Sequence, residues 1–149
     1  MTAREFSKRM GLFLLILGLI SLIPGLVGPL RGLPPLRINL SYGRFLGYLP
    51  LNLLSKMILI ALGLSGLLTA AKKESVEDAS IDYARVLFYI MGTLSSFSWF
   101  RDTSTFFGYM PIFRGAGIFF GIVSLMGLYY GYFTRRARVH DDKSQTHAV

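Results

Sequence analysis

The chain has 149 residues, of which 52% are hydrophobic and 16% are charged, and its formal net charge is +8. It is too apolar for an ordinary soluble domain, because its polar residues gather at the ends of long apolar segments. The absence of cysteine excludes disulfides, thiolate metal sites and cysteine nucleophiles. Beside apolar segments of this length, the positive charge indicates contact with anionic lipid head groups rather than with nucleic acid.

The first apolar segment covers residues 10–30 and carries no charge between Arg9 and Arg31. A helix rises about 1.5 Å per residue, so about 20 residues cross the hydrocarbon core of a bilayer. We therefore predict a membrane span, which Pro24 kinks and Pro29 ends. A cleaved signal peptide is the alternative, but this segment exceeds the ~7–15 apolar residues of a signal and no small-x-small cleavage site follows it.

Three further apolar segments follow, at residues 49–71, 81–100 and 112–134. The segment at 112–134 is free of charge from residue 115 onward. The other two hold charged residues only near their ends, with Lys56 in the segment at 49–71 and Arg85 in the segment at 81–100. Four spans are the simplest interpretation, so we predict an all-α integral membrane protein with a four-helix bundle.

The two halves of the chain follow the same plan. Gly47-Tyr48-Leu49-Pro50 precedes the second span, and Gly108-Tyr109-Met110-Pro111 precedes the fourth. In each half, the first span begins after basic residues and the second span ends at a basic pair. The turn lies between the two spans. The bundle is therefore predicted to contain two similar helix-pair repeats, with each proline at a helix start, where a missing N–H costs nothing.

An even number of spans places both termini on the same side of the membrane. With the N-terminus inside, ten of the 16 Lys and Arg residues face inward and six face outward. The positive-inside rule therefore predicts cytoplasmic termini. Residues 1–134 are expected to form one transmembrane domain, followed by a polar cytoplasmic tail at 135–149.

Small residues recur on one face of the first and last spans. In lipid, helices associate through close packing over such residues. At about 100° per residue, this spacing forms a narrow stripe. We expect the stripe to serve packing within the bundle, although a dimer would use the same residues. The predicted packing residues are Gly18 and Gly25 in the first span and Gly117, Gly121, Gly127 and Gly131 in the fourth.

The spans lack the groups that catalysis or metal binding requires. Both histidines, His140 and His147, lie in the tail, and no acidic residue lies near a span centre. No nucleophile–base pair, phosphate loop or metal-binding spacing is present. We therefore expect no cofactor, no metal and no enzymatic activity.

One polar cluster remains, at the outer ends of the spans. Asn52 and Lys56 are four residues apart and share a helix face. Arg101, Asp102 and Arg114 approach the same membrane level from the third and fourth spans. The cluster suggests an outward-facing site for an anionic lipid head group or another small anion. The simpler interpretation is that the cations extend to the interface while Asp102 caps or pairs locally.

The run from Ser41 to Asn52, with its Tyr42-Gly43 and Pro50-Leu51-Asn52 elements, resembles an uncharacterised family of small four-span bacterial membrane proteins, frequent in cyanobacteria and actinobacteria. Tyr83-Ala84-Arg85 matches the start of that family's third span. The resemblance covers roughly residues 10–134. It implies the four-span fold and a bacterial inner or thylakoid membrane, and it brings no established activity.

Together these patterns predict a non-enzymatic multi-pass membrane protein. Its expected role is that of an accessory or scaffold subunit that packs against membrane protein partners, lipids or further copies of itself. A small solute transporter or channel with an outward-facing basic site is the alternative, because transporters often contain repeats. A membrane enzyme ranks third, and we expect no nucleic-acid partner.

Overall fold

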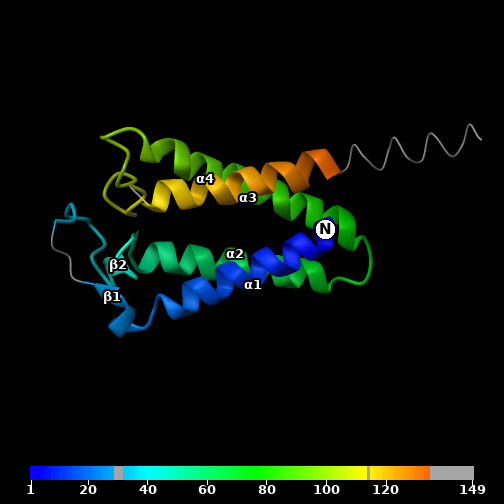
Figure 1. The fold of residues 1–149 in the computed structure, drawn as a ribbon, viewed down its shortest axis with the longest axis horizontal. Coiled ribbons are helices and arrows are strands. Elements are labelled where there is room, and N and C mark those ends of the chain that lie inside the picture. The colour runs from blue at the N-terminus through cyan, green and yellow to red at the C-terminus, as the bar shows by residue number, and fades with distance from the viewer. Residues whose placement is uncertain (29–31, 114, 135–149) are drawn as a thin grey trace, which may run out of the picture.

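The computed structural model describes residues 1–28, 32–113 and 115–134. In this part of the chain the predicted helical fold is confirmed: four long helices pack in pairs, with a small sheet at one end (Figure 1). The helices are α1 (Ala3–Ile20), α2 (Leu53–Ala71), α3 (Val76–Ser98) and α4 (Gly115–Leu128). The shorter elements are the 3-10 turn η1 (Pro24–Leu26), the strands β1 (Val27–Gly28), β2 (Gly43–Phe45) and β3 (Leu49–Leu51), and the π-helical turn η2 (Tyr129–Phe133).

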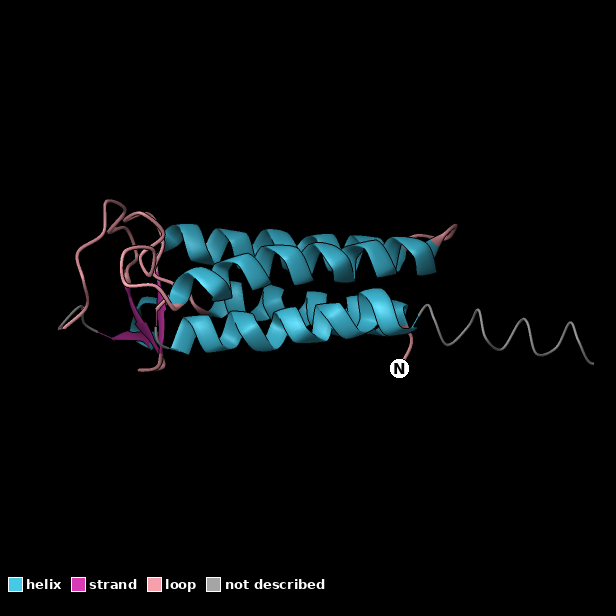
Figure 2. Cartoon of the chain, turned by 90° about the horizontal axis from the view of Figure 1, so that it is seen from above, coloured by secondary structure: helices cyan, strands magenta, loops and turns pink. Residues whose placement is uncertain are grey.

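The helices run alternately up and down. α1 leads from the N-terminus toward the sheet, α2 returns, and α3 and α4 repeat this path (Figures 1 and 2). The start of α1, the α2–α3 link and η2 therefore share one end of the bundle, which we call the N-terminal end. The strands and the turn before α4 occupy the other, which we call the sheet end. The predicted tail, residues 135–149, lies outside the described residues.

Helix α1 differs from the predicted first span, residues 10–30. It begins at Ala3, because Thr2 and Glu5 form a reciprocal capping box with each other's backbone N–H groups. It ends at Ile20, and Pro24 does not kink it but opens η1 beyond the helix. The chain leaves the helix early because the residues after η1 are extended and pair with β2.

By length and composition, two of the described helices could cross a membrane. They are Leu53–Ala71, with a mean hydropathy of 1.9, and Gly115–Phe133, with a mean hydropathy of 1.5. Apolar core helices of soluble proteins meet the same criterion, so this observation is weak evidence on its own. α1 carries four charged residues in its first seven, and α3 carries Asp82 and Arg85.

Glycines bring α1 and α2 into backbone contact. A Cβ added at Gly11 would lie 2.8 Å from the carbonyl oxygen of Gly63, and one added at Gly63 would collide with the backbone of Leu15. Gly18 lies against Ile60, farther along the same pair. These approaches leave no room for larger side chains, so the glycines set the distance between the two helices.

Helices α3 and α4 pack in the same way. A Cβ added at Gly127 would lie 2.6 Å from the carbonyl oxygen of Ala84 and 2.8 Å from the amide nitrogen of Phe88. Three other glycines also lie against α3: Gly117 against Ser98, Gly121 against Ser95 and Gly131 against Arg85. The stripe on the last span therefore faces its neighbour within this chain.

Gly25 is an exception among the predicted packing residues. It lies in η1, and a Cβ added there would meet nothing within 4 Å. The stripe predicted for the first span extends to Gly25 only if the helix continues beyond Ile20, and α1 ends at that residue.

The three-stranded antiparallel sheet was not expected from the sequence. β2 lies between β1 and β3, and Arg44 is paired with both Gly28 and Pro50. Leu46 and Gly47 make the tight turn between β2 and β3, both with positive φ. Pro50 therefore lies in a strand and not at the helix start predicted for it.

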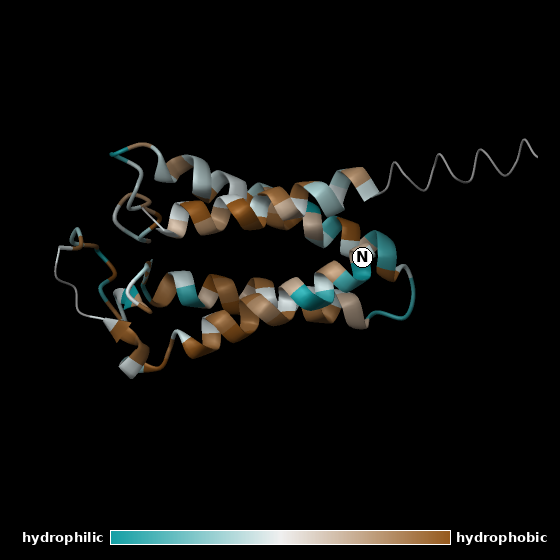
Figure 3. Cartoon of the chain, viewed as in Figure 1, coloured by the Kyte–Doolittle hydropathy of each residue, from teal (hydrophilic) through white to brown (hydrophobic). Residues whose placement is uncertain are grey.

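The helices are hydrophobic along much of their length (Figure 3), and many of their large apolar side chains are exposed. Residues 10–20, 57–71, 86–98 and 115–128 of the four helices contain no charged residue. Most charged residues of the four helices lie toward the N-terminal end, where Figure 3 shows hydrophilic segments, and Lys56 lies near the sheet end of α2. Examples of exposed apolar residues are Phe13 and Leu19 on α1, Met57 and Leu68 on α2, Val86 and Ile90 on α3, and Ile118 and Leu125 on α4.

Candidate functional site

Asn52 connects the start of α2 to two loops of the sheet end. Its side chain is fully buried, and its Oδ1 accepts hydrogen bonds from the backbone N–H of Ser55 at 3.0 Å and from the Ser55 hydroxyl at 2.9 Å. Its Nδ2 donates to the carbonyl oxygens of Ile38, at 3.1 Å, and Tyr109, at 2.6 Å. One side chain therefore caps the helix and joins the loop before β2 to the loop before α4.

Lys56 lies one turn farther along α2 and is also fully buried. Its Nζ donates to the carbonyl oxygen of Ser41 at 3.0 Å and to the Ser41 hydroxyl at 2.6 Å. Ser41 has a left-handed backbone conformation, with φ of 54°. In residues 1–28, 32–113 and 115–134 the Lys56 ammonium forms no ion pair, so its hydrogen bonds join it to neutral groups of the loop that covers it.

The predicted anion site is therefore divided in the structure. Asn52 and Lys56 face the protein interior, whereas Arg101 and Asp102 lie exposed on the turn after α3. Within the described residues, the side chains of Arg101 and Asp102 form no hydrogen bond or ion pair. Arg114, the fifth member, lies outside the described residues. Lys56 does not present its charge outward, because the loop through Ser41 folds over it.

Other residues of the same region were not predicted from the sequence. Arg37 donates from Nη1 to the Tyr109 hydroxyl at 3.2 Å, and its guanidinium lies 5.4 Å from the centroid of that ring. The Tyr42 hydroxyl donates to the carbonyl oxygen of Pro34 at 3.1 Å. Burial raises the pKa of Tyr42, while nearby Arg44 acts in the opposite direction. Loop residues of this kind follow no helical or strand period, so their roles can be recognised only from their contacts in the folded structure.

Lys56 bonds to Ser41, and Asn52 bonds to Ser55 and to the backbone carbonyls of two loops. Burying an unpaired polar group costs free energy, and here the buried donors have acceptors. This cluster, which we call the sheet-end clamp (Ser41, Asn52 and Lys56), fixes two loops over the ends of α2 and α3. Its geometry supports holding these loops in place better than it supports binding a ligand.

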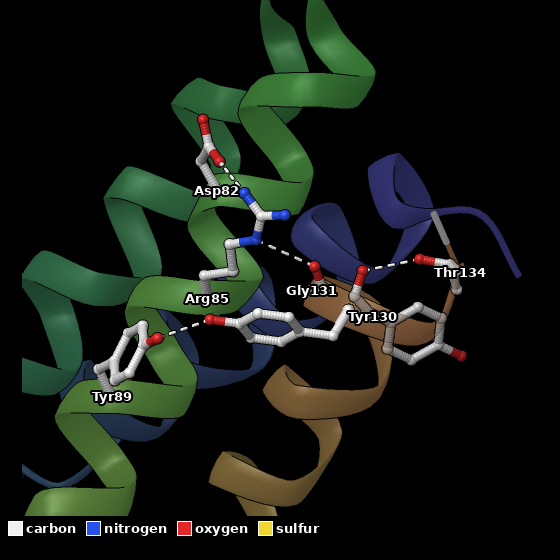
Figure 4. A network of polar contacts seen from close by, with 7 residues as sticks. Asp82, Arg85, Tyr89, Tyr130, Gly131 and Thr134 are labelled. Atoms are coloured by element: carbon white, nitrogen blue, oxygen red, sulfur yellow. Dashed lines mark hydrogen bonds and ion pairs between the residues drawn. The ribbon is translucent and has the colours of Figure 1, made fainter. Parts of the chain in front are cut away.

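A second polar cluster lies at the N-terminal end, where α3 meets η2 (Figure 4). Arg85 donates from Nε to the carbonyl oxygen of Gly131 at 3.1 Å and from Nη1 to Asp82 at 3.1 Å. Its guanidinium lies 5.1 Å from the ring centroid of Tyr132, whose hydroxyl is 2.6 Å from that of Tyr89. Arg85 therefore connects α3 to η2 through the backbone carbonyl of Gly131 and the ring of Tyr132.

The π-helical geometry of η2 explains this cluster. A π turn shifts the hydrogen bonds of the backbone and changes which carbonyls are paired within the helix. Two side chains bond to carbonyls of this turn: Arg85 to Gly131, and Thr134 to Tyr130 at 2.7 Å. These contacts stabilise a local distortion of the helix.

Hydroxyl groups connect the helices along the bundle. Ser95 donates to the carbonyl oxygen of Gly117 at 3.0 Å, and Ser124 donates to that of Phe88 at 3.0 Å. Tyr83 donates to Leu62 of α2 at 3.0 Å. Each of these hydroxyls bonds to the backbone of a neighbouring helix and therefore has a partner within the bundle.

In residues 1–28, 32–113 and 115–134, no three His, Cys, Asp or Glu side chains are grouped so that they could hold a metal ion.

Comparisons with known proteins give one match. No curated protein and no solved structure matches the chain. Residues 4–133 match the sequence profile of a family described as a domain of unknown function, DUF4383. Because the match covers most of its length, the chain belongs to the DUF4383 family.

Proposed function

We propose that this protein is a non-enzymatic, multi-pass membrane protein that serves as an accessory or scaffold subunit. The proposal rests on one observation above all: large apolar side chains are exposed on all four helices, over stretches that contain no charge. In water such a surface would promote association, whereas in a bilayer it matches the hydrocarbon. All four helices, including α1 and α3, are proposed to cross the membrane.

The proposed orientation places the N-terminal end in the cytoplasm. The start of α1 and the α2–α3 link lie at this end (Figure 1). Ten of the 16 Lys and Arg residues then lie on the cytoplasmic side, counting the tail, and this asymmetry supports the orientation. The source membrane is proposed to be a bacterial inner or thylakoid membrane.

A subunit role agrees better with the polar contacts than transport does. A transporter needs polar side chains that face a pathway near the midplane. In the described helices, the hydroxyls of Ser95 and Ser124 bond to neighbouring backbone instead. The buried Lys56 bonds to Ser41 and does not form the outward-facing basic site that the transporter alternative uses.

Native-gel migration after extraction in a mild detergent tests the subunit role. A subunit should migrate from its native membranes as a discrete assembly larger than a few copies of a 16.7 kDa chain. The same chain, expressed in a host that lacks its partners, is the control and should migrate as a small species. A monomer or small oligomer from both sources, with a melting temperature that rises on addition of a solute, would contradict the subunit role and support transport.

A further inference from the structure

An apolar groove lies between α1 and α4, toward the N-terminal end. Its volume is about 440 Å³. Phe6, Met10 and Val123 are buried residues of its lining. Phe13 and Phe119, whose ring centroids are 6.2 Å apart, join the two helices within the same lining. The groove exists because the helices pack as α1–α2 and α3–α4 pairs, so that contacts between α1 and α4 are sparse.

The lining of the groove is suited to a flexible hydrocarbon chain. It contains aromatic and aliphatic side chains together with Met10 and Met126, whose unbranched thioethers adapt to irregular shapes. A partner transmembrane helix is a poorer fit. Close helix packing uses small residues, whereas the accessible walls here carry Phe13 and Ile122.

Arg9 carries the charged side chain in the lining of this groove. Its side chain is exposed, and within the described residues its guanidinium forms no hydrogen bond or ion pair. Arg9 precedes the uncharged part of α1, so in the proposed orientation it lies near the cytoplasmic head groups. A guanidinium binds a phosphate through two parallel hydrogen bonds, and the cytoplasmic leaflet supplies anionic lipids.

We propose that this groove binds an acyl chain of an anionic phospholipid whose phosphate is held by Arg9. The proposal rests on the membrane location proposed above. It assigns the apolar lining to the chain of the lipid and the unpaired cation to its head group. The site lies at the opposite end of the bundle from the sheet-end clamp.

Fluorescence quenching by brominated lipids tests this site. The chain has one tryptophan, Trp99, so in a Trp99→Phe background all tryptophan fluorescence comes from an Ile122→Trp reporter. Ile122 lines the groove and is 56% exposed, so it tolerates the larger side chain. The full chain is reconstituted in phosphatidylcholine vesicles that contain phosphatidylglycerol, with one or the other lipid brominated in its acyl chains.

From the quenching by each brominated lipid, we expect an affinity of the groove for phosphatidylglycerol that is about fivefold higher than that for phosphatidylcholine. Arg9→Gln should abolish the preference. Lys8→Gln is the matched control, because Lys8 is an exposed cation of the same helix turn that does not line the groove, and it should retain the preference. A Leu64→Trp reporter on α2 should show no preference in any of these backgrounds.

Three results would overturn the proposal. The first is equal quenching by the two lipids at the Ile122→Trp reporter. The second is a preference that survives Arg9→Gln or disappears equally with Lys8→Gln. The third is an Ile122→Trp reporter that neither lipid quenches while the Leu64→Trp reporter is quenched, since protein would then cover the groove. Absence of quenching at both reporters would instead refute the membrane location.

Discussion

Asn52→Ala is expected to lower the free energy of unfolding by roughly 3 to 7 kcal/mol. The substitution removes the cap of α2 and leaves the carbonyl oxygens of Ile38 and Tyr109 without their donor. Loss of a helix cap costs about 1 kcal/mol, and each buried group left unpaired costs about 1–3 kcal/mol. Thermal unfolding in detergent, followed by circular dichroism, measures the change as a fall of about 10 °C in the melting temperature.

Asn52→Asp separates the two roles of this side chain. Aspartate is as good a helix cap as asparagine, so a residue that served only as a cap would tolerate the change. Aspartate, however, cannot donate to Ile38 and Tyr109, so we expect destabilisation comparable to that of the alanine variant. Asn39→Asp is the matched control and should be neutral, because Asn39 is exposed and, within the described residues, its side chain bonds through its oxygen alone, toward Leu36. A stable Asn52→Asp variant would show that the clamp does not join the loops.

Gly63→Ala is expected to destabilise the α1–α2 pair by about 1–3 kcal/mol. The added methyl group would meet the backbone of Leu15 and the carbonyl oxygen of Gly11, which cannot move unless the helices separate. Gly25→Ala is the control, because nothing lies within 4 Å of a Cβ at that position. The melting temperatures of both variants, measured at several protein concentrations, provide the comparison.

The concentration dependence distinguishes packing within the chain from a dimer interface. Packing of α1 against α2 predicts a loss for Gly63→Ala that is the same at every protein concentration. A loss that disappears at high concentration, or a Gly63→Ala variant as stable as Gly25→Ala, would contradict the contact. The glycines of α4 face α3 in the same manner, so the argument applies to both pairs.

The helices could be predicted from the sequence because their signals are local. The apolar segments predict α2 and α4 near their observed positions, but α3 begins at Val76, five residues before the predicted segment, because its first turns carry charged residues. The first span is displaced because hydropathy alone cannot register the capping box at Thr2, which starts the helix among charged residues. The last part of the apolar run is not helical, because Val27 and Gly28 form the strand β1 and pair with β2.

The sheet end could not be predicted in the same way. Its strands are two or three residues long, and one contains a proline, so no alternating pattern identifies them. The grouping of Asn52 with Lys56 was visible as a helix face. The burial of Lys56 depends on Ser41, which is 15 residues away and bonds through a left-handed turn. Such contacts are properties of the folded loop and leave no periodic trace.

The membrane position of the bundle is tested most directly by labelling single cysteines in intact spheroplasts. The chain contains no cysteine, so Tyr48→Cys, at the exposed turn of the sheet end, and Glu74→Cys, in the α2–α3 link, each provide one thiol. We predict that a membrane-impermeant maleimide labels Tyr48→Cys in intact spheroplasts and labels Glu74→Cys only after lysis. Labelling of both thiols from the same side, or recovery of the chain in the supernatant without detergent, would contradict a bundle that spans the bilayer.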